Sequence, residues 1–311
     1  MSGQHWLVTG AAGFIGSNLS AYLLARGDRV TGLDDLSTGT EANIGRLRER
    51  GGDAFAFVRG DIRDPAAVRA VLGGVDVVAH LAAQVSVPKS FDDPCYTDSI
   101  NVAGFLSVAT AAEEAGVARV IYVSSCAIYG DNPALPLAET EAPRPLSPYA
   151  VSKLANELYA DTLRSRTHGP DLVGLRLFNI YGPWQDHRGG YAAVIPKWIE
   201  LCAAGERPVL FGDGSATRDF CFVDDVARLI AGIGGREERT PHAVYNVGTG
   251  VATSLTDLFA GIRDALAARG VSLPFDGPGK QPPRHGDIVH SLADIGRARA
   301  DLGFEPLTPL A

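Results

Sequence analysis

A tyrosine and a lysine, Tyr149 and Lys153, stand four residues apart in a stretch that predicts a helix. Residues at this spacing share one face of a helix, so the ammonium lies close to the phenol. A nearby ammonium stabilises a phenolate and lowers the pKa of the phenol, which makes Tyr149 a candidate general base. Ser124 and Ser125 end a predicted strand, at the edge where open α/β sheets bind ligands. By spacing alone, a solvated tyrosine and lysine on a surface helix is the competing interpretation.

A glycine-rich turn, Gly10-Ala11-Ala12-Gly13-Phe14-Ile15-Gly16, joins the first predicted strand to the first predicted helix. Glycine lets the backbone approach a pyrophosphate closely, and the helix start supplies free N–H groups for it. Asp34 ends the second predicted strand, where a carboxylate can accept hydrogen bonds from both ribose hydroxyls. It would repel a 2′-phosphate, and the following Asp35 and Leu36 supply no cation, so NAD is favoured over NADP. A plain turn and a solvated loop acid are the alternatives.

Short apolar runs alternate with amphipathic stretches through residues 5–180. Near-continuous Val, Ile and Leu runs indicate strands that are covered on both faces. The predicted strands are Trp6–Thr9, Arg29–Leu33, Phe55–Arg59, Val75–His80, Val120–Ser124 and Leu172–Leu177. The predicted helices are Ser17–Arg26, Pro65–Leu72, Asn101–Ala115 and Tyr149–Ser165. This alternation predicts an α/β fold with a Rossmann-like doubly wound parallel sheet.

After Gly182 the pattern changes, and proline, glycine and aromatic residues become frequent. A helix is predicted over Val194–Ala204, a strand that returns to the main sheet at Ala243–Val247, and two helical stretches within 251–311. Residues 1–181, with a return segment near 222–250, are predicted to form the NAD-binding domain. Residues 182–221 and 251–311 are predicted to form a smaller, discontinuous lobe for the second ligand.

The composition argues against several classes of partner. The chain has 311 residues with 28 Lys or Arg and 36 Asp or Glu, a formal net charge of −8. An acidic surface repels phosphate backbones, so we expect no nucleic-acid partner and no anionic membrane surface. No apolar run approaches the ~20 residues of a spanning helix, and the first residues lack the basic start of a secretion signal. The four cysteines are widely spaced without a CxxC, so we expect no disulfide framework, no metal site and a cytoplasmic location.

Several motifs resemble the extended short-chain dehydrogenase/reductases that modify nucleotide sugars, and the similarity covers nearly the whole chain. These motifs are GAAGFIG at Gly10–Gly16, HLAA at His80–Ala83, SSCAIYG at Ser124–Gly130 and SPYAVSK at Ser147–Lys153. Segments further along resemble the bacterial UDP-N-acetylglucosamine 4-epimerases in particular. They are LRLFNIYG at Leu175–Gly182, YAAVIPKW at Tyr191–Trp198, DGSATRDF at Asp213–Phe220 and RHGDIVHSLADI at Arg284–Ile295.

The resemblance implies NAD-dependent epimerisation at C4 of a UDP-hexose, through a transient 4-keto sugar and with no net consumption of NAD. Tyr149 matches the tyrosine that removes the 4-hydroxyl proton, and Lys153 matches the lysine that contacts the nicotinamide ribose. Ser125 matches the serine that hydrogen-bonds the reacting oxygen. Besides the glycine turn and Asp34, the implied NAD-binding residues are Asp61, Ile62, Leu81, Ala82, Ala83, Asn101, Ser124, Tyr149 and Lys153.

The substrate site implied by the resemblance falls mostly in the second lobe. Arg218 and Arg284 match diphosphate-binding arginines, whose guanidinium groups suit pyrophosphate oxygens; solvation or an internal ion pair is the alternative. Asp287 matches an acid that binds the uridine ribose, and Asn179 matches an asparagine that contacts the sugar or its phosphate. The remaining implied substrate residues are Ser125, Cys126, Ala193, Val194, Leu210, Phe211 and Ser291.

Ser291, four positions after Asp287, matches a residue at the wall of the hexose pocket. Relatives restricted to glucose and galactose resemble one another in a bulky aromatic there, whereas those that accept N-acetyl sugars have a small residue. We therefore expect interconversion of UDP-N-acetylglucosamine and UDP-N-acetylgalactosamine, with UDP-glucose and UDP-galactose as a further pair. A plain loop serine is the competing interpretation.

Other activities on the same scaffold remain as alternatives. The 4,6-dehydratases need an acid pair where this chain has Cys126 and Ala127, which disfavours dehydration. Uronate epimerases and decarboxylases usually place an arginine just after the YGP turn. This chain has Trp184-Gln185-Asp186 there, and Asp186 would repel a uronate, although Arg188 is close. A non-catalytic NAD-binding sensor need not retain Ser125, Tyr149 and Lys153 together. The family also implies a homodimer built from two helices of the NAD domain, and it commonly continues past the position of Ala311 with another helix.

Overall fold

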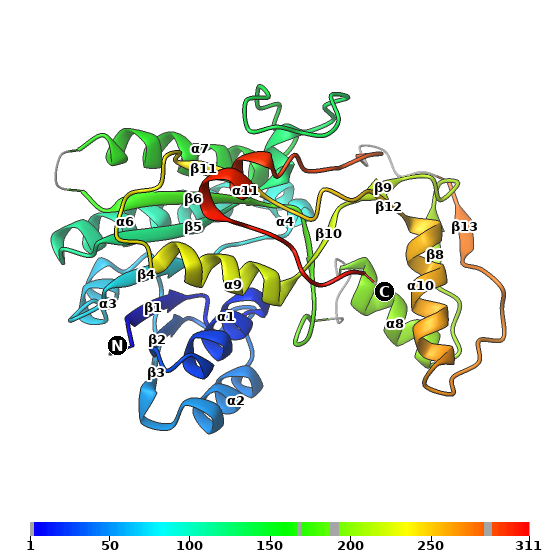
Figure 1. Cartoon of the computed structure of the whole chain (residues 1–311), viewed down its shortest axis with the longest axis horizontal. Helices are drawn as coiled ribbons and strands as arrows, with labels where there is room; N and C mark the ends of the chain where they lie inside the picture. The colour runs from blue at the N-terminus through cyan, green and yellow to red at the C-terminus, as the bar shows by residue number, and fades with distance from the viewer. Residues whose placement is uncertain (1–2, 167–168, 187–192, 283–287, 311) are drawn as a thin grey trace.

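The computed structural model describes residues 3–166, 169–186, 193–282 and 288–310, and a seven-stranded sheet forms its centre (Figure 1). The strand order is β11-β6-β5-β4-β1-β2-β3, and every neighbouring pair is parallel. The strands are β1 (His5–Thr9), β2 (Arg29–Asp34), β3 (Phe55–Arg59), β4 (Val77–His80), β5 (Arg119–Ser125), β6 (Asp171–Leu177) and β11 (Val244–Val247). This confirms the predicted doubly wound parallel sheet, whose switch point lies between β1 and β4.

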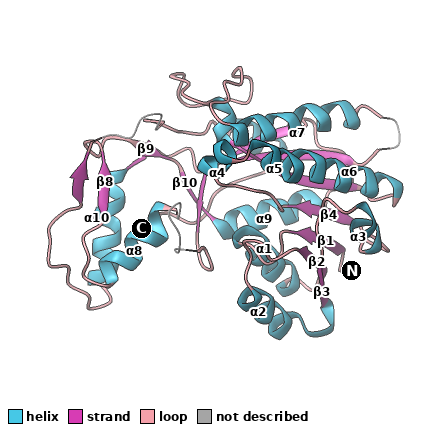
Figure 2. Ribbon diagram, turned by 180° about the vertical axis from the view of Figure 1, so that it is seen from behind, coloured by secondary structure: helices cyan, strands magenta, loops and turns pink. Residues whose placement is uncertain are grey.

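Helices cover both faces of this sheet, as Figure 2 shows from behind. One face carries α1 (Phe14–Ala25), α2 (Glu41–Gly51), α9 (Val223–Gly234) and α11 (Gly296–Leu302), packed around Trp6 and Val8 of β1. The other carries α3 (Pro65–Ala70), α6 (Gly104–Glu114) and α7 (Pro148–Arg164), packed around Leu7, Val120 and Tyr122. Short turns complete the large domain: η1 (Gly52–Ala54), α4 (Val87–Asp92), α5 (Pro94–Asp98), the π-helical η2 (Ser99–Ala103) and η3 (Cys126–Tyr129).

The smaller lobe stands at one end of the molecule, where Figure 1 shows α8 and α10 side by side. It contains α8 (Val194–Ala203), β8 (Val209–Phe211), β9 (Thr217–Arg218), β12 (Thr253–Ser254), α10 (Leu255–Ala267) and β13 (Gly279–Gln281). Its own apolar core includes Trp198, Leu210, Phe259 and Phe275. A parallel pair, β7 (Asn179–Tyr181) with β10 (Phe220–Phe222), joins the lobe to the large domain.

Two differences from the predicted elements bear on how the domains are built, and the other predicted bounds shift by at most three residues. Helix α1 begins at Phe14, three residues before the predicted start, because the glycine turn leads straight into helical backbone. Helix α11 does not belong to the smaller lobe, although all of 251–311 is predicted to do so. Ala298 of α11 and Phe304 beyond it are buried in the large core, because the chain returns there after β13.

Among the described residues, no helix is both long and apolar enough to span a membrane.

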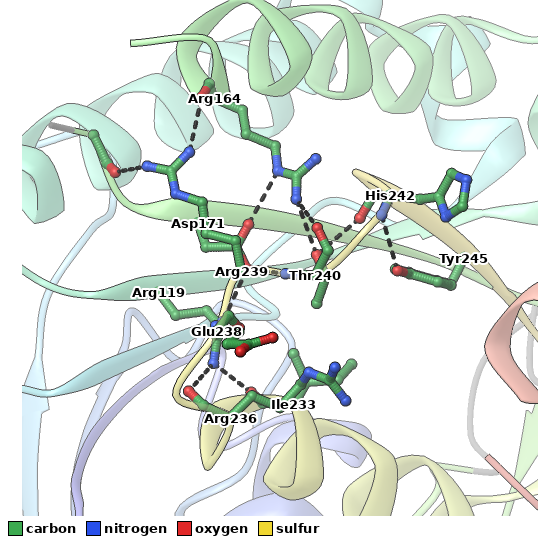
Figure 3. A network of polar contacts seen from close by, with 12 residues as sticks. Arg119, Arg164, Asp171, Ile233, Arg236, Glu238, Arg239, Thr240, His242 and Tyr245 are labelled. Carbon is green, nitrogen blue, oxygen red and sulfur yellow. Dashed lines mark hydrogen bonds and ion pairs between the residues drawn. The ribbon is translucent and has the colours of Figure 1, made fainter. Parts of the chain in front are cut away.

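A polar network braces the amino ends of β5 and β6, the edge opposite the ends of the strands that hold Ser124 and Ser125 (Figure 3). Asp171, at the start of β6, accepts hydrogen bonds from Arg119 Nε at 3.1 Å and from Arg164 Nε at 3.0 Å. Its Oδ2 also accepts from the backbone N–H of Thr240 at 2.9 Å. Arg119 in turn donates to the carbonyl oxygens of Ile233, Arg236 and Glu238. The network therefore fixes the connection from α9 to β11 against the sheet.

Candidate active site

The glycine-rich turn lies at the carboxyl end of β1, beside the switch point of the sheet. Gly10 has a φ of 71°, and a Cβ there would lie 2.7 Å from the backbone nitrogen of Ala82, so only glycine fits. A Cβ on Gly16 would collide with the carbonyl oxygen of Gly10. No side chain caps α1 at Gly13. The first turn, with Phe14 and Ile15, therefore offers the kind of helix start that binds phosphate groups.

Asp34 ends β2 next to this turn and is buried. Its Oδ2 accepts from the backbone N–H of Ala12 at 2.9 Å, and its Oδ1 accepts from that of Leu36 at 2.8 Å. Burial raises the pKa of Asp34, and these two hydrogen bonds oppose that effect. Each carboxylate oxygen keeps a further lone pair, so the group can still accept from ribose hydroxyls.

The segment after β4 forms the other wall of the glycine turn. The backbone N–H groups of Leu81 and Ala82 both donate to the hydroxyl of Thr9, at 3.2 Å each. Ala83 follows, half-buried. Asn101 supports the segment from η2, because its amide group exchanges hydrogen bonds with the backbone of Gln84 at 2.8 and 3.0 Å. The amide also donates to the hydroxyl of Ser152 on α7.

Asp61 and Ile62 follow β3 at the same carboxyl edge. The Asp61 carboxylate forms a two-pronged ion pair with Arg63, which lowers the pKa of Asp61. Ile62 is buried and packs against the start of α6 at Gly104. Both residues thus already have protein partners, and contact with NAD at these two positions stays a prediction.

Ser125, Tyr149 and Lys153 come together where β5 ends against α7. Ser147 caps α7 by accepting from the backbone N–H of Ala150, which fixes the helix start that carries Tyr149. Ser125 lies beside the Tyr149 side chain, where it lowers the pKa of the phenol. Lys153 Nζ lies 5.9 Å from the centre of the Tyr149 ring and donates to the carbonyl oxygen of Val123 at 2.8 Å. The arrangement places a phenol, a hydroxyl and an ammonium around one point.

The expected lowering of the Tyr149 pKa is wrong for the protein alone. Burial raises the pKa of Tyr149 to about 12, although the neighbouring Ser125 opposes this. Burial also lowers the pKa of Lys153 to about 8, against the effect of the negative charge on Glu157. His80 on β4 is fully buried, which lowers its pKa to about 3, so it is neutral beside the Lys153 ammonium. The phenol therefore needs a further positive charge before it can ionise near neutral pH.

Two further charged residues, Glu157 and Arg176, lie at this site outside the motifs found in the sequence. Glu157 accepts from the Ser124 hydroxyl at 2.5 Å and from two nitrogens of Arg176, at 3.0 and 2.7 Å. Both charged side chains are buried. One signal was available, because Glu157 follows Lys153 by four residues and so lies on the same helix face.

A cleft of about 1290 Å³ separates the large domain from the smaller lobe. Val194 of α8, Leu210 and Phe211 of β8, and Arg218 of β9 line it, and Ala193 directly precedes α8. Ser86 and Val87, at the start of α4, line the wall on the large domain. Lys197 and Lys280 add positive charge, so the cleft suits an elongated anionic ligand.

Cys126 directly follows Ser125, and Ser291 follows the cleft residue Val289 by two positions. The Cys126 thiol lies beside Ser291. Burial raises the pKa of the thiol to about 11, and Ser291 and the Arg218 charge oppose that rise. Ser291 is buried and its backbone N–H donates to the carbonyl oxygen of Thr217. Arg218 Nη2 donates to the carbonyl oxygen of Ile288 at 2.7 Å, and Nη1 to that of Val289 at 3.1 Å.

The structure describes some of the predicted substrate residues and leaves others outside the described ranges. Asn179, on β7, is half-buried, and its backbone N–H donates to the carbonyl oxygen of Asp219 at 3.0 Å. Arg284 and Asp287 lie outside the described residues, as does Arg188. Within the described part of the chain, no group of three or more His, Cys, Asp or Glu could hold a metal ion, and all four cysteines are unpaired.

Comparison with known proteins identifies the class. The model of the NAD dependent epimerase/dehydratase family matches residues 6–248. The UDP-glucose 4-epimerase of Mycolicibacterium smegmatis is 42% identical over 308 residues, which cover 98% of this chain and 94% of that protein. The chain therefore belongs to the NAD dependent epimerase/dehydratase family. It is an NAD-dependent enzyme of the nucleotide-sugar 4-epimerase kind.

Two solved structures share the fold over almost their full length. The UDP-N-acetylglucosamine 4-epimerase of Methanobrevibacter ruminantium, in complex with UDP-N-acetylmuramic acid, is 36% identical with a TM-score of 0.89, covering 99% of this chain and 94% of that one. The UDP-glucose 4-epimerase of Thermus thermophilus, in complex with NAD, is 34% identical with a TM-score of 0.84, covering 98% and 95%.

The residues at the switch point fit NAD. Gly10 and Gly16 leave no room for a side chain along the turn, α1 starts without a side-chain cap, and Asp34 stands beside the turn with lone pairs to accept. A dinucleotide needs these three features, namely close backbone approach, a free helix start and a ribose acceptor. The cofactor would thus extend from Asp34 across the turn toward Tyr149 and Lys153.

Replacing Asp34 by alanine is expected to weaken NAD binding by roughly 10–100-fold, because hydrogen bonds to a charged acceptor contribute about 1.5–3 kcal/mol. Loss of the Asp34 carboxylate also removes the repulsion of a 2′-phosphate, so the ratio of the NADP and NAD dissociation constants should become smaller. Binding of each dinucleotide is measured by titration calorimetry. Asp35→Ala is the matched control, since that carboxylate accepts only from the nearby Ser37 backbone in the described structure. A wild-type protein that binds NADP as tightly as NAD would contradict the assignment.

Proposed function

We propose that the enzyme interconverts UDP-N-acetylglucosamine and UDP-N-acetylgalactosamine. The observation that carries this proposal is Ser291, a small buried side chain that lies beside Cys126, which in turn lies beside Tyr149. A small residue at the pocket wall leaves space for an acetamido group while the keto sugar turns. The likeness to the Methanobrevibacter ruminantium UDP-N-acetylglucosamine 4-epimerase supports the same substrate class.

On this proposal, the large domain and the smaller lobe bind different ligands. The large domain holds NAD along the glycine turn, and the cleft against the smaller lobe holds the nucleotide and its diphosphate near Arg218, Lys197 and Lys280. Arginine forks match phosphate oxygens. Leu210 and Phe211 of β8 supply apolar surface for the uracil ring. On this proposal the hexose lies between Ser86, Cys126 and Ser291, with its 4-hydroxyl at Tyr149.

Proton transfer is assigned to Tyr149. Its oxygen takes the proton from the sugar 4-hydroxyl and later returns it, and the Ser125 hydroxyl donates to the same reacting oxygen. Lys153, held by the Val123 carbonyl, stabilises the phenolate that this requires. Bound NAD supplies the hydride acceptor and, through its positively charged nicotinamide ring, the further charge that favours ionised Tyr149. The buried setting excludes water, which protects the transient keto sugar.

A uronate substrate is the second candidate, and one residue argues against it. Asp186 follows the Gly182–Pro183 turn, where its negative charge would repel a substrate carboxylate. Dehydration is disfavoured because Cys126 and Ala127 occupy the positions where the dehydratases place their acid pair.

The test of the proposed function is incubation with a panel of UDP-sugars, including UDP-glucose, UDP-N-acetylglucosamine and UDP-glucuronate, followed by NMR of the products. Turnover confined to the uronate would overturn the proposal.

Ser291→Tyr is expected to depress turnover of the acetylated sugar far more than that of UDP-glucose. Overpacking a tight site costs about 1–3 kcal/mol, which corresponds to roughly 5–150-fold in kcat/KM. The measurement is kcat/KM for both substrates in the variant and the wild type. Ser291→Ala is the control, because it keeps the space and removes only the hydroxyl group. Equal losses on both sugars would contradict the pocket-size argument.

We also propose that the enzyme is a homodimer. Val151, Leu158 and Tyr159 are exposed along one face of α7, and Phe91 is exposed on the neighbouring α4. An apolar face of this kind on adjacent helices suits a second copy of the same surface. Sedimentation equilibrium at micromolar concentration measures the mass in solution, and a monomer would contradict this proposal.

A further inference from the structure

Glu157 is a buried carboxylate that the proposed proton transfer does not use. It lies one helical turn beyond Lys153 on α7 and is 6% exposed. Its Oε1 accepts from Ser124 Oγ at 2.5 Å and from Arg176 Nε at 3.0 Å, while its Oε2 accepts from Arg176 Nη2 at 2.7 Å. One side chain therefore joins the ends of β5 and β6 to the helix that carries the catalytic tyrosine and lysine.

Arg176 continues the connection toward the substrate side. Its Nη1 donates to the Tyr129 hydroxyl at 2.8 Å, and that hydroxyl donates to Asn246 Oδ1 at 2.7 Å. Asn246 Nδ2 donates to the carbonyl oxygens of Leu137 and Asp294, at 2.8 and 3.1 Å. Because Asp294 follows Ser291 by three residues, the network reaches the segment that forms the hexose wall.

Stability alone is a weak reason for such a group. A buried ion pair is often no more stabilising than apolar side chains of the same volume, since both charges lose their hydration. This pair also lies at the carboxyl end of the sheet, next to the reacting groups, and its anion is on the same helix face as Lys153. These facts indicate a role for the charge itself.

The groups around Lys153 show what that charge does. Tyr149 and Glu157 face it from α7, His80 faces it from β4, and the Val123 carbonyl of β5 accepts its hydrogen bond. Of these, His80 is neutral and Tyr149 is protonated in the protein alone. Among these groups, Glu157 therefore supplies the negative charge that opposes the effect of burial on the ammonium.

We propose that Glu157 is a positioning residue, whose carboxylate braces Ser124 and Arg176 against α7 and keeps Lys153 an ammonium beside Tyr149. The assignment rests on the proposed function insofar as Lys153 must be charged for Tyr149 to act as the base. The hydrogen bonds of Glu157 with Ser124 and Arg176, and the charge on Lys153, do not depend on which sugar is turned over.

The first experiment measures Lys153 directly, without turnover. The chain has four lysines, Lys89, Lys153, Lys197 and Lys280, so ¹³Cε-lysine NMR gives a simple spectrum, and Lys153→Arg assigns the signal. In the NAD-loaded protein, Glu157→Gln is expected to lower the Lys153 titration midpoint by about one pH unit or more, because an opposite charge nearby typically shifts a pKa by that amount. Tyr129→Phe is the matched control: it removes a hydrogen bond of Arg176 and leaves the charges. It should titrate as the wild type does.

The second experiment follows kcat against pH with whichever UDP-sugar the wild type turns over. If Lys153 must be charged, activity falls as pH rises through its pKa, so Glu157→Gln should move the alkaline limb to lower pH. The Lys153 pKa is about 8, so lowering it by one unit reduces the charged fraction of Lys153 at pH 8 about fivefold. We expect kcat to fall by the same factor, with a much smaller change in KM. If the single variant does not fold, Glu157→Gln combined with Arg176→Gln removes both charges, and its midpoint should still lie below the wild type.

An unchanged Lys153 midpoint in the folded variants would overturn the assignment. A lowered midpoint with an unmoved alkaline limb would overturn the link to catalysis. If the wild type turns over no UDP-sugar, the proposed function fails, and the NMR titration still decides the role of Glu157.

Discussion

Replacing Tyr149 by phenylalanine is expected to lower turnover of the sugar nucleotide by about 10²–10⁴-fold, the range that general acid–base groups contribute. Ser125 lies beside the Tyr149 side chain, and the Lys153 ammonium lies 5.9 Å from the ring centre. Phenylalanine fills the same buried volume but cannot accept or return a proton. The glycine turn and Asp34 lie on other elements, so the variant should keep its NAD. The measurements are steady-state turnover and the NAD content of the purified variant.

Tyr159→Phe provides the matched control for this change. Tyr159 lies on the same helix, ten residues further on, and is exposed in the single chain. It belongs to the surface proposed for the dimer, and phenylalanine keeps the apolar ring there. The control should turn over as the wild type does, because its hydroxyl is far from the strand end that carries Ser125. A folded Tyr149→Phe protein that contains NAD and retains near-normal turnover would show that another group moves the proton.

The parts of the site that sequence could predict are those set by a single element. Tyr149 and Lys153 share a helix face through their spacing, and the glycine turn joins one strand to one helix. Asp34 and Ser125 each end a strand, and the carboxyl ends of parallel strands meet at one edge. Once the strands were recognised, the fold class and the predicted place of the cofactor followed from local patterns.

Features that depend on several distant elements could not be predicted. The Glu157–Arg176 pair joins α7 to β6, and its continuation through Tyr129 to Asn246 adds β11, so no local motif contains it. The pKa of Tyr149 follows from how deeply neighbouring elements bury it, which spacing with Lys153 does not reveal. Helix α11 is short and polar, and its place on the large core depends on two buried residues, Ala298 and Phe304.

Asp171→Ala is expected to lower the free energy of unfolding by about 3–5 kcal/mol, the usual loss when one partner of a buried ion pair is removed. The Asp171 side chain is 1% exposed and pairs with Arg119, itself 5% exposed, and with Arg164. Alanine would leave the buried Arg119 guanidinium without its anion and would free the backbone N–H of Thr240. Because that N–H belongs to the connection into β11, the edge of the sheet should loosen with it. Urea denaturation followed by circular dichroism measures the change.

Glu114→Ala is the matched control, since its ion pair with Arg69 is more than half exposed on both sides. Exposed pairs contribute about 0–1 kcal/mol, so this variant should unfold close to the wild type. The Asp171 network lies at the amino ends of the strands, whereas Ser125, Tyr149 and Lys153 lie at the carboxyl end. At temperatures where the Asp171→Ala protein remains folded, its kcat should therefore stay near that of the wild type. A small change in unfolding free energy with a large loss of kcat would mean that this edge of the sheet communicates with the active site.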